Sequence, residues 1–219
     1  MIIIVLFIIG FLLGLGYAFI GEKLPLLVPE VIPKEENSWI FNLFMGVVNA
    51  LVLLVSYYYF GLSYEFFASL IIAGLVLIIF ISDFKYMIIL DSPLIVSGVL
   101  ILILRAYFNG FKDAGLHLLW GTILFLVMLL IGFIGKKIFK KEALGGGDIK
   151  LAGIIGLILG LKLGLVSIIL SSLLALPYAI ASVLLNKDSE VPFGPFLIAS
   201  MAIVFSFADK FLNLIAFLT

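Results

Sequence analysis

Residues 145–150 read Gly145-Gly146-Gly147-Asp148-Ile149-Lys150 and stand between a basic run and a strongly apolar segment. Three successive glycines are a poor continuation of a helix, because glycine loses more backbone freedom on folding than any other residue. They do allow a sharp turn or a close approach of the backbone to another group. Asp148 follows at the start of an apolar segment, where an ionisable side chain is costly and indicates a functional site. The stretch therefore predicts a helix that enters a membrane with a carboxylate at its N-terminal end.

Composition decides the class of fold. Apolar residues make up 65% of the 219 residues and charged residues 12%, whereas soluble domains contain about 45–50% apolar residues. The apolar runs repeatedly approach the roughly 20 residues that a membrane-spanning helix needs. We predict an all-α, polytopic membrane helix bundle of about eight transmembrane helices. It forms a single membrane-embedded domain over residues 1–219, with no separate soluble domain.

The expected spans follow the apolar runs along the chain. The first run has no basic segment before it and no small-residue cleavage site, which favours a retained helix over a signal peptide. Its glycines Gly10, Gly14 and Gly16 suit close helix packing. The last span is followed by an apolar tail that we expect along the membrane interface. The spans are 2–20, 39–60, 64–82, 92–108, 116–135, 149–160, a seventh that begins at a turn over 161–164 and ends near 185, and 196–207.

Positive charge predicts the orientation of the bundle. With eight spans, the loops 22–38, 83–91, 136–150 and 186–191 share one side of the membrane. That side carries nine lysines (Lys23, Lys34, Lys85, Lys136, Lys137, Lys140, Lys141, Lys150 and Lys187), against Arg105, Lys112, Lys162 and Lys210 on the other. Cytoplasmic loops are enriched in Lys and Arg. We therefore expect Asp83, Asp91 and Asp148 on the cytoplasmic face of the cell membrane.

The residue types that are missing also limit the chemistry. The chain has no cysteine, which excludes disulfides, thiol catalysis and cysteine-bound zinc. A single His117 cannot build a histidine metal site, and we expect it to be structural. A net charge of zero gives no argument for nucleic acid. We expect no metal, no cofactor and no nucleic-acid partner.

Two aspartates remain as the candidates for catalysis. Two carboxylates held close with little water cannot both ionise easily, so one carries a proton that the pair shares. Such a pair can hydrolyse a peptide bond, one carboxylate activating water while the protonated one polarises the carbonyl. Asp83 closes one expected span and Asp148 opens another on the same side. We predict Asp83 and Asp148 as the catalytic pair, with Gly145, Gly146 and Gly147 allowing a substrate backbone to approach.

Four ordered segments resemble one family, the prepilin leader peptidases, which are GxGD-type membrane aspartic endopeptidases. Residues 145–151 resemble its GxGD signature, and Asp83 followed by Asp91 resembles its first-aspartate motif. Val191-Pro192-Phe193-Gly194-Pro195 resembles its Ile-Pro-Phe-Gly-Pro segment. Gly10-Phe11-Leu12 with the later Lys23-Leu24-Pro25 is similar to its N-terminal motif. A lone GxGD would be weak evidence, but four segments in order are specific.

The resemblance implies cleavage of the basic leader from type IV prepilins or pseudopilins at the cytoplasmic membrane face. The family's catalytic pair corresponds to Asp83 and Asp148. Asp91, Lys150 and the segment Pro192, Phe193, Gly194 and Pro195 are expected around the site. The partners it implies are prepilin or pseudopilin peptides and membrane lipid.

The chain departs from the family at two places. Position 90 is leucine where the family usually has proline, so the turn before Asp91 is expected to differ. The family's cysteine-containing zinc insertion, associated with N-methylation, is replaced by a short cytoplasmic loop over residues 22–38. The resemblance therefore supports the peptidase and does not extend to the methyltransferase.

Simpler interpretations stand beside these roles. Asp91 is also placed to cap the next helix, Lys85 and Lys150 to anchor the cytoplasmic face, and Pro192–Pro195 to form a turn. Three other functions stay open. They are a presenilin-like intramembrane protease, a transporter that relays protons or cations through the same aspartates, and a catalytically inactive assembly protein.

Overall fold

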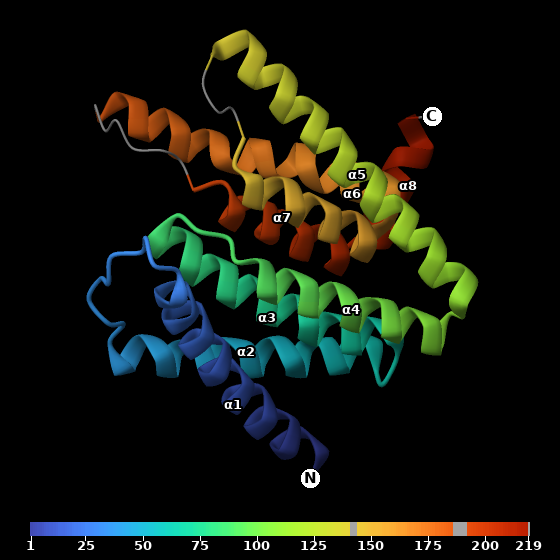
Figure 1. The fold of residues 1–219 in the computed structure, drawn as a ribbon. Coiled ribbons are helices and arrows are strands. Elements are labelled where there is room, and N and C mark those ends of the chain that lie inside the picture. The colour runs from blue at the N-terminus through green and yellow to red at the C-terminus, as the bar shows by residue number, and fades with distance from the viewer. Residues whose placement is uncertain (141–143, 186–191, 219) are drawn as a thin grey trace. The chain divides into compact units, whose positions relative to one another are not determined.

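The computed structural model describes residues 1–140, 144–185 and 192–218. Its contacts divide the chain into two compact units, Met1–Gly110 and Phe111–Thr219. Within the described residues every regular element is a helix (Figure 1). The prediction of an all-α fold is confirmed, while the single domain stays a prediction.

Among the described residues, six helices are long and apolar enough to cross a membrane. The number rises to seven if α7 (Gly194–Ser206) and α8 (Ala208–Leu218), which meet at a bend of 84°, count as one span. The polytopic membrane class is thus confirmed. Two of the expected spans, 149–160 and the one that ends near 185, both fall within α6 (Gly146–Leu184), which is counted here as one helix.

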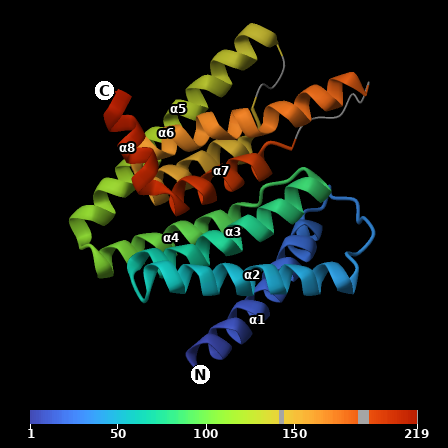
Figure 2. The same ribbon diagram turned by 180° about the vertical axis from the view of Figure 1, so that it is seen from behind.

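Unit 1 contains α1 (Ile2–Lys23), a short 3₁₀ turn η1 (Leu24–Leu27), α2 (Trp39–Phe60), α3 (Tyr64–Tyr86) and α4 (Asp91–Phe108). The central helix is α3, which packs against α1, α2 and α4. In both views α1 crosses its neighbours obliquely (Figures 1 and 2). A Cβ at Gly10 would lie 2.7 Å from the Cα of Ala50 in α2. The close packing predicted for Gly10 and Gly14 is confirmed, whereas Gly16 has nothing within 4 Å of a Cβ.

Unit 2 contains α5 (Phe111–Phe139), α6, α7 and α8, with α6 packed against both α5 and α7. Inside α6 the backbone breaks at Gly160, where φ is 76° and ψ is 179°. A Cβ at Gly164 would lie 3.5 Å from the Cα of Gly156, although eight residues of straight helix would separate the two by about 12 Å. The chain therefore turns back at Gly160, and α6 is a helical hairpin (Figure 1).

The hairpin corrects the predicted turn over residues 161–164. The turn is made at Gly160 because its conformation is open essentially to glycine alone, and Lys162 and Gly164 already belong to the second arm. His117 of α5 supports this end of the unit. Its Nδ1 lies 3.0 Å from the carbonyl oxygen of Leu157, and the last carbonyls of a helical arm lack regular partners. The structural role predicted for His117 fits this contact.

Candidate functional site

Asp83 lies in the last turn of α3 and its side chain is 6% exposed. Met87 ends the helix in the left-handed conformation, with φ 57°, and its N–H donates to the Asp83 carbonyl at 2.9 Å. The helix thus runs four residues beyond the predicted end of its span at Ser82, so Asp83 is part of it. An anion is disfavoured at a helix C-terminus, where the helix dipole is negative. A buried carboxylate at this position is therefore costly.

A buried ion pair involves Lys85, two residues after Asp83 in α3, and the sequence alone did not predict it. Lys85 Nζ donates to Glu22 Oε1 at 2.8 Å and to Asn37 Oδ1 at 3.2 Å. Glu22 Oε1 also accepts from the Asn37 backbone N–H at 2.7 Å. The side chains of Lys85 and Glu22 are 14% and 6% exposed. The available signal was an acidic residue at the edge of an apolar run. The 22–38 segment is thus tied to the end of α3.

Asp148 lies in the first turn of α6, with a half-buried side chain. The positive end of the helix dipole stabilises an anion there by about 0.3–1 kcal/mol. A Cβ at Gly145 would lie 3.0 Å from Asp148 Oδ2, closer than ordinary van der Waals contact at 3.4–4 Å. Gly145 therefore leaves room for the carboxyl group. Gly146, by contrast, has nothing within 4 Å of a Cβ.

Asp91 is exposed in the first turn of α4. The N-cap is Leu90, so the prediction that Asp91 caps this helix is wrong by one position. Leu90 has φ −80° and ψ 141°, which falls in the range that proline adopts. The leucine at position 90 therefore leaves the backbone in a conformation that proline would also take. That the turn before Asp91 differs from the family's stays a prediction.

The other predicted site residues lie in unit 2. Lys150 is exposed on α6. Pro192 is buried, Phe193 is the N-cap of α7, and Gly194 and Pro195 form its buried first turn. The N–H groups of Phe196 and Leu197 both donate to the Phe193 carbonyl at 3.1 Å. This segment therefore starts a helix. Val191 and Lys141 lie outside the described residues.

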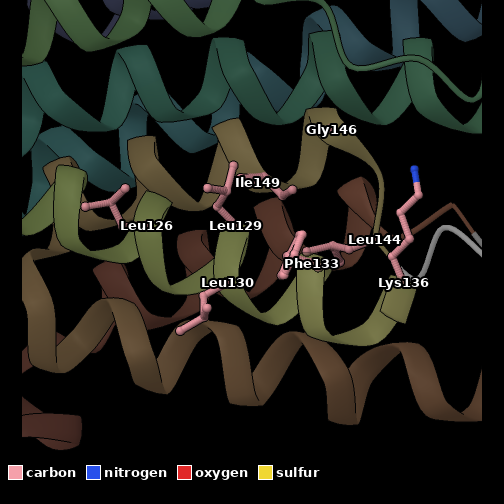
Figure 3. Close-up of a pocket in the computed structure, with 9 residues that line it drawn as sticks. Leu126, Leu129, Leu130, Phe133, Lys136, Leu144, Gly146 and Ile149 are labelled. Carbon is pink, nitrogen blue, oxygen red and sulfur yellow. The ribbon is translucent and has the colours of Figure 1, made fainter. Parts of the chain in front are cut away.

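An apolar groove of about 740 Å³ opens between α5 and the start of α6 (Figure 3). Gly146 and Ile149 line one side of it, directly before and after Gly147 and Asp148. Leu126, Leu129, Leu130 and Phe133 of α5 line the other side, with Lys136 at one end. The groove presents apolar side chains along about 15 Å of α5, from position 126 to position 136. Residues adjoining Asp148 thus face an apolar space.

The predicted catalytic pair has one member in each unit. Asp83 and Asp91 belong to unit 1, while residues 145–150 and 192–195 belong to unit 2. That Asp83 and Asp148 meet stays a prediction. Among the described residues no group of three or more His, Cys, Asp or Glu side chains could hold a metal ion.

Comparison with known proteins identifies relatives. The model of the Type IV leader peptidase family matches residues 70–180, a range that includes Asp83, Asp91 and residues 145–150. The prepilin leader peptidase/N-methyltransferase of Bacillus subtilis is 28% identical over 163 residues, which cover 70% of this chain and 61% of the relative. The protein of the same description from Vibrio cholerae is 26% identical over 163 residues, covering 73% and 64%. The chain thus spans less than two thirds of either relative. No solved structure matches it significantly.

Proposed function

The chain belongs to the type IV leader peptidase family, and from this premise we propose that it is a membrane aspartic endopeptidase that removes leader peptides from type IV prepilins or pseudopilins. The observation that carries the proposal is that the family match includes Asp83 and Asp148, the two aspartates predicted to be catalytic. One is buried at an unfavourable helix terminus, and the other adjoins a glycine that makes room for its carboxyl group.

In the proposed reaction Asp83 and Asp148 share one proton. The ionised carboxylate takes a proton from a water molecule, whose oxygen attacks the scissile carbonyl carbon. The protonated carboxyl group donates its proton to the carbonyl oxygen. As the C–N bond breaks, the peptide nitrogen takes the proton that came from water, and a hydroxyl of the tetrahedral intermediate returns its proton to the pair as the product carboxyl group forms. Because the two groups titrate as a pair, acid and base are roles of the pair. No covalent intermediate and no cofactor are needed.

The surroundings of Asp148 suit an extended peptide that arrives from the membrane. Gly145 places no side chain against the Asp148 carboxyl group, and the groove beside Gly146 and Ile149 offers apolar contact. Cytoplasmic loops are enriched in Lys and Arg, and the lysine-rich loops support a cytoplasmic position for this end of the chain. We propose that the site opens to the cytoplasm and that Lys150, Asp91 and residues 192–195 shape its surroundings.

The test is cleavage of a purified type IV prepilin by the detergent-solubilised chain, followed by mass spectrometry of the product. Asp83→Asn and Asp148→Asn should each lower the rate at least about 10²–10⁴-fold, the usual contribution of acid–base catalysis. Asp209→Asn is the matched control, because Asp209 is an exposed carboxylate of α8 outside the matched range. An intact prepilin after incubation with the wild-type chain would contradict the proposal, as would full cleavage by either variant.

The same spectra separate the neighbouring possibilities. A cut at the edge of the leader fits a prepilin peptidase, and a cut inside the apolar segment fits an intramembrane protease. A methyl group on the new N-terminus would reveal the second activity named in the relatives' descriptions, which we do not propose for this chain. Proton flux into liposomes that Asp148→Asn abolishes, without peptide cleavage, would instead indicate a transporter.

A further inference from the structure

The ion pair between Glu22 and Lys85 is largely buried, with side chains 6% and 14% exposed. Glu22 is the penultimate residue of α1 and Lys85 the penultimate residue of α3. Three groups surround the Lys85 ammonium: Glu22 Oε1 at 2.8 Å, Asn37 Oδ1 at 3.2 Å and the Tyr86 ring centroid at 5.7 Å. The contact therefore joins α1, the 22–38 segment and the end of α3.

The packing of α1 against α3 brings the two charges together. A Cβ at Gly21 would lie 3.1 Å from both the Ile78 carbonyl oxygen and Ile81 Cβ. Ile78, Ile81 and Lys85 are spaced three and four residues apart and share one face of α3. Lys85 thus continues the face that receives α1, and Glu22 follows directly after the glycine that permits the approach.

Burying such a pair gains little stability. Removing two charges from water offsets most of their attraction, so a buried ion pair is weak evidence for stabilisation and is better understood as fixing one arrangement. The exposed pair between Lys23 and Glu36 in the same segment provides a comparison, with side chains 37% and 77% exposed. Of these two pairs, Glu22–Lys85 is the one whose charges are removed from water, and its Lys85 is two residues after Asp83.

Asp83 and Lys85 point to different sides of α3, since two residues of helix turn by about 200°. Lys85 holds one side of the last turn while Asp83 occupies the other. Helix ends fray, and this one ends immediately afterwards at Met87. Catalytic groups must keep their positions to within about 0.5 Å to work. A turn that carries a reacting carboxylate therefore needs an anchor from outside the helix.

We propose that Glu22 is a positioning residue of the peptidase, which acts through Lys85 to hold the last turn of α3 and so fixes the Asp83 carboxyl group. The inference rests on the proposed function. It assigns a role to the 22–38 segment as well, because Asn37 binds both members of the pair.

The test compares kcat and KM of the full-length chain on a purified prepilin. Glu22→Gln and Lys85→Met should each lower kcat about 10- to 100-fold, the loss expected when a reacting group is displaced by up to about 1 Å. KM should change less than about threefold, because neither side chain is assigned a contact with the substrate. The double variant should lose no more than the single ones, since all three remove the same contact. The matched control is Glu36→Gln, which removes the exposed partner of Lys23 and should leave kcat unchanged.

Assays run well below the unfolding temperature of each variant separate positioning from stability, because a pair that only stabilises the fold would leave kcat of the folded chain intact. A folded Glu22→Gln variant with kcat within twofold of wild type would overturn the proposal, as would a rise in KM at constant kcat. If Glu22→Gln does not fold, Glu22→Asp keeps the charge but shortens the reach, and a kcat within twofold of wild type would overturn it equally. Failure of the wild-type chain to cleave prepilin would instead contradict the proposed function.

Discussion

Replacing Gly145 by alanine should slow cleavage by crowding the Asp148 carboxyl group. The added Cβ would lie 3.0 Å from Asp148 Oδ2, where ordinary contacts begin at 3.4 Å. The carboxyl group or the turn must therefore move by about 0.4 Å, the difference between these two distances. If a displacement of 1 Å costs about 100-fold, a proportional loss on the logarithmic scale predicts kcat about sixfold lower, or roughly 1 kcal/mol.

The assay is the rate of prepilin cleavage under saturating substrate, with thermal unfolding measured in parallel. Gly145→Val adds two further carbons and should lose more activity than Gly145→Ala. Gly115→Ala in α5 is the control, because nothing lies within 4 Å of a Cβ there. Equal kcat for the wild type, Gly145→Ala and Gly145→Val would refute the steric reasoning.

Three further substitutions test the local backbone and its supports. Leu90→Pro should preserve cleavage and raise the unfolding free energy by about 0.4–1 kcal/mol, because Leu90 already has a proline-like conformation; a loss of stability would contradict this. Gly160→Ala should destabilise the chain by about 1–3 kcal/mol, because φ 76° with ψ 179° is strained for any residue with a side chain; an unchanged unfolding temperature would show that the turn is made differently. His117→Ala should cost about 1–3 kcal/mol by leaving the Leu157 carbonyl without this donor. Its cleavage rate at low temperature should match wild type, and a loss of kcat without a loss of stability would place His117 in the reaction.

The sequence was sufficient for the class of fold and for most helix positions, because apolar runs of membrane length leave few alternatives. The second span was predicted at 39–60, and α2 covers Trp39–Phe60. Helix ends that depend on the conformation of a single residue were harder to predict from the sequence. Helix α3 continues past Asp83 and ends only at Met87, which is in the left-handed region. In α6 the chain turns back at Gly160, one residue before the predicted turn.

Long-range contacts were beyond the sequence for a different reason. Glu22 and Lys85 are 63 positions apart, and each resembles an ordinary charge at the edge of a span. Only the close approach of α1 at Gly21 makes them partners. The proposed catalytic residues, by contrast, stand out through local context, since Asp148 follows three glycines and Asp83 ends a long apolar run.

The central claim is that Asp83 and Asp148, one from each unit, work within a single site. The chain has no cysteine, so cysteine pairs can be introduced without interference and linked by a short thiol-reactive cross-linker. Ser167→Cys with Ser200→Cys is the positive control, because the two hydroxyl oxygens lie 3.0 Å apart. Asp148→Cys with Lys162→Cys is the negative control, since Asp148 begins the first arm of α6 and Lys162 lies just past the turn at the far end of that arm.

The decisive measurement is the yield of cross-linked Asp83→Cys/Asp148→Cys protein, quantified by mass spectrometry of its peptides. Carboxylates that share a proton must lie within a few ångströms of each other, so the account predicts a yield close to that of the serine pair. A yield no higher than that of the negative control, with prepilin present as well as absent, would contradict it.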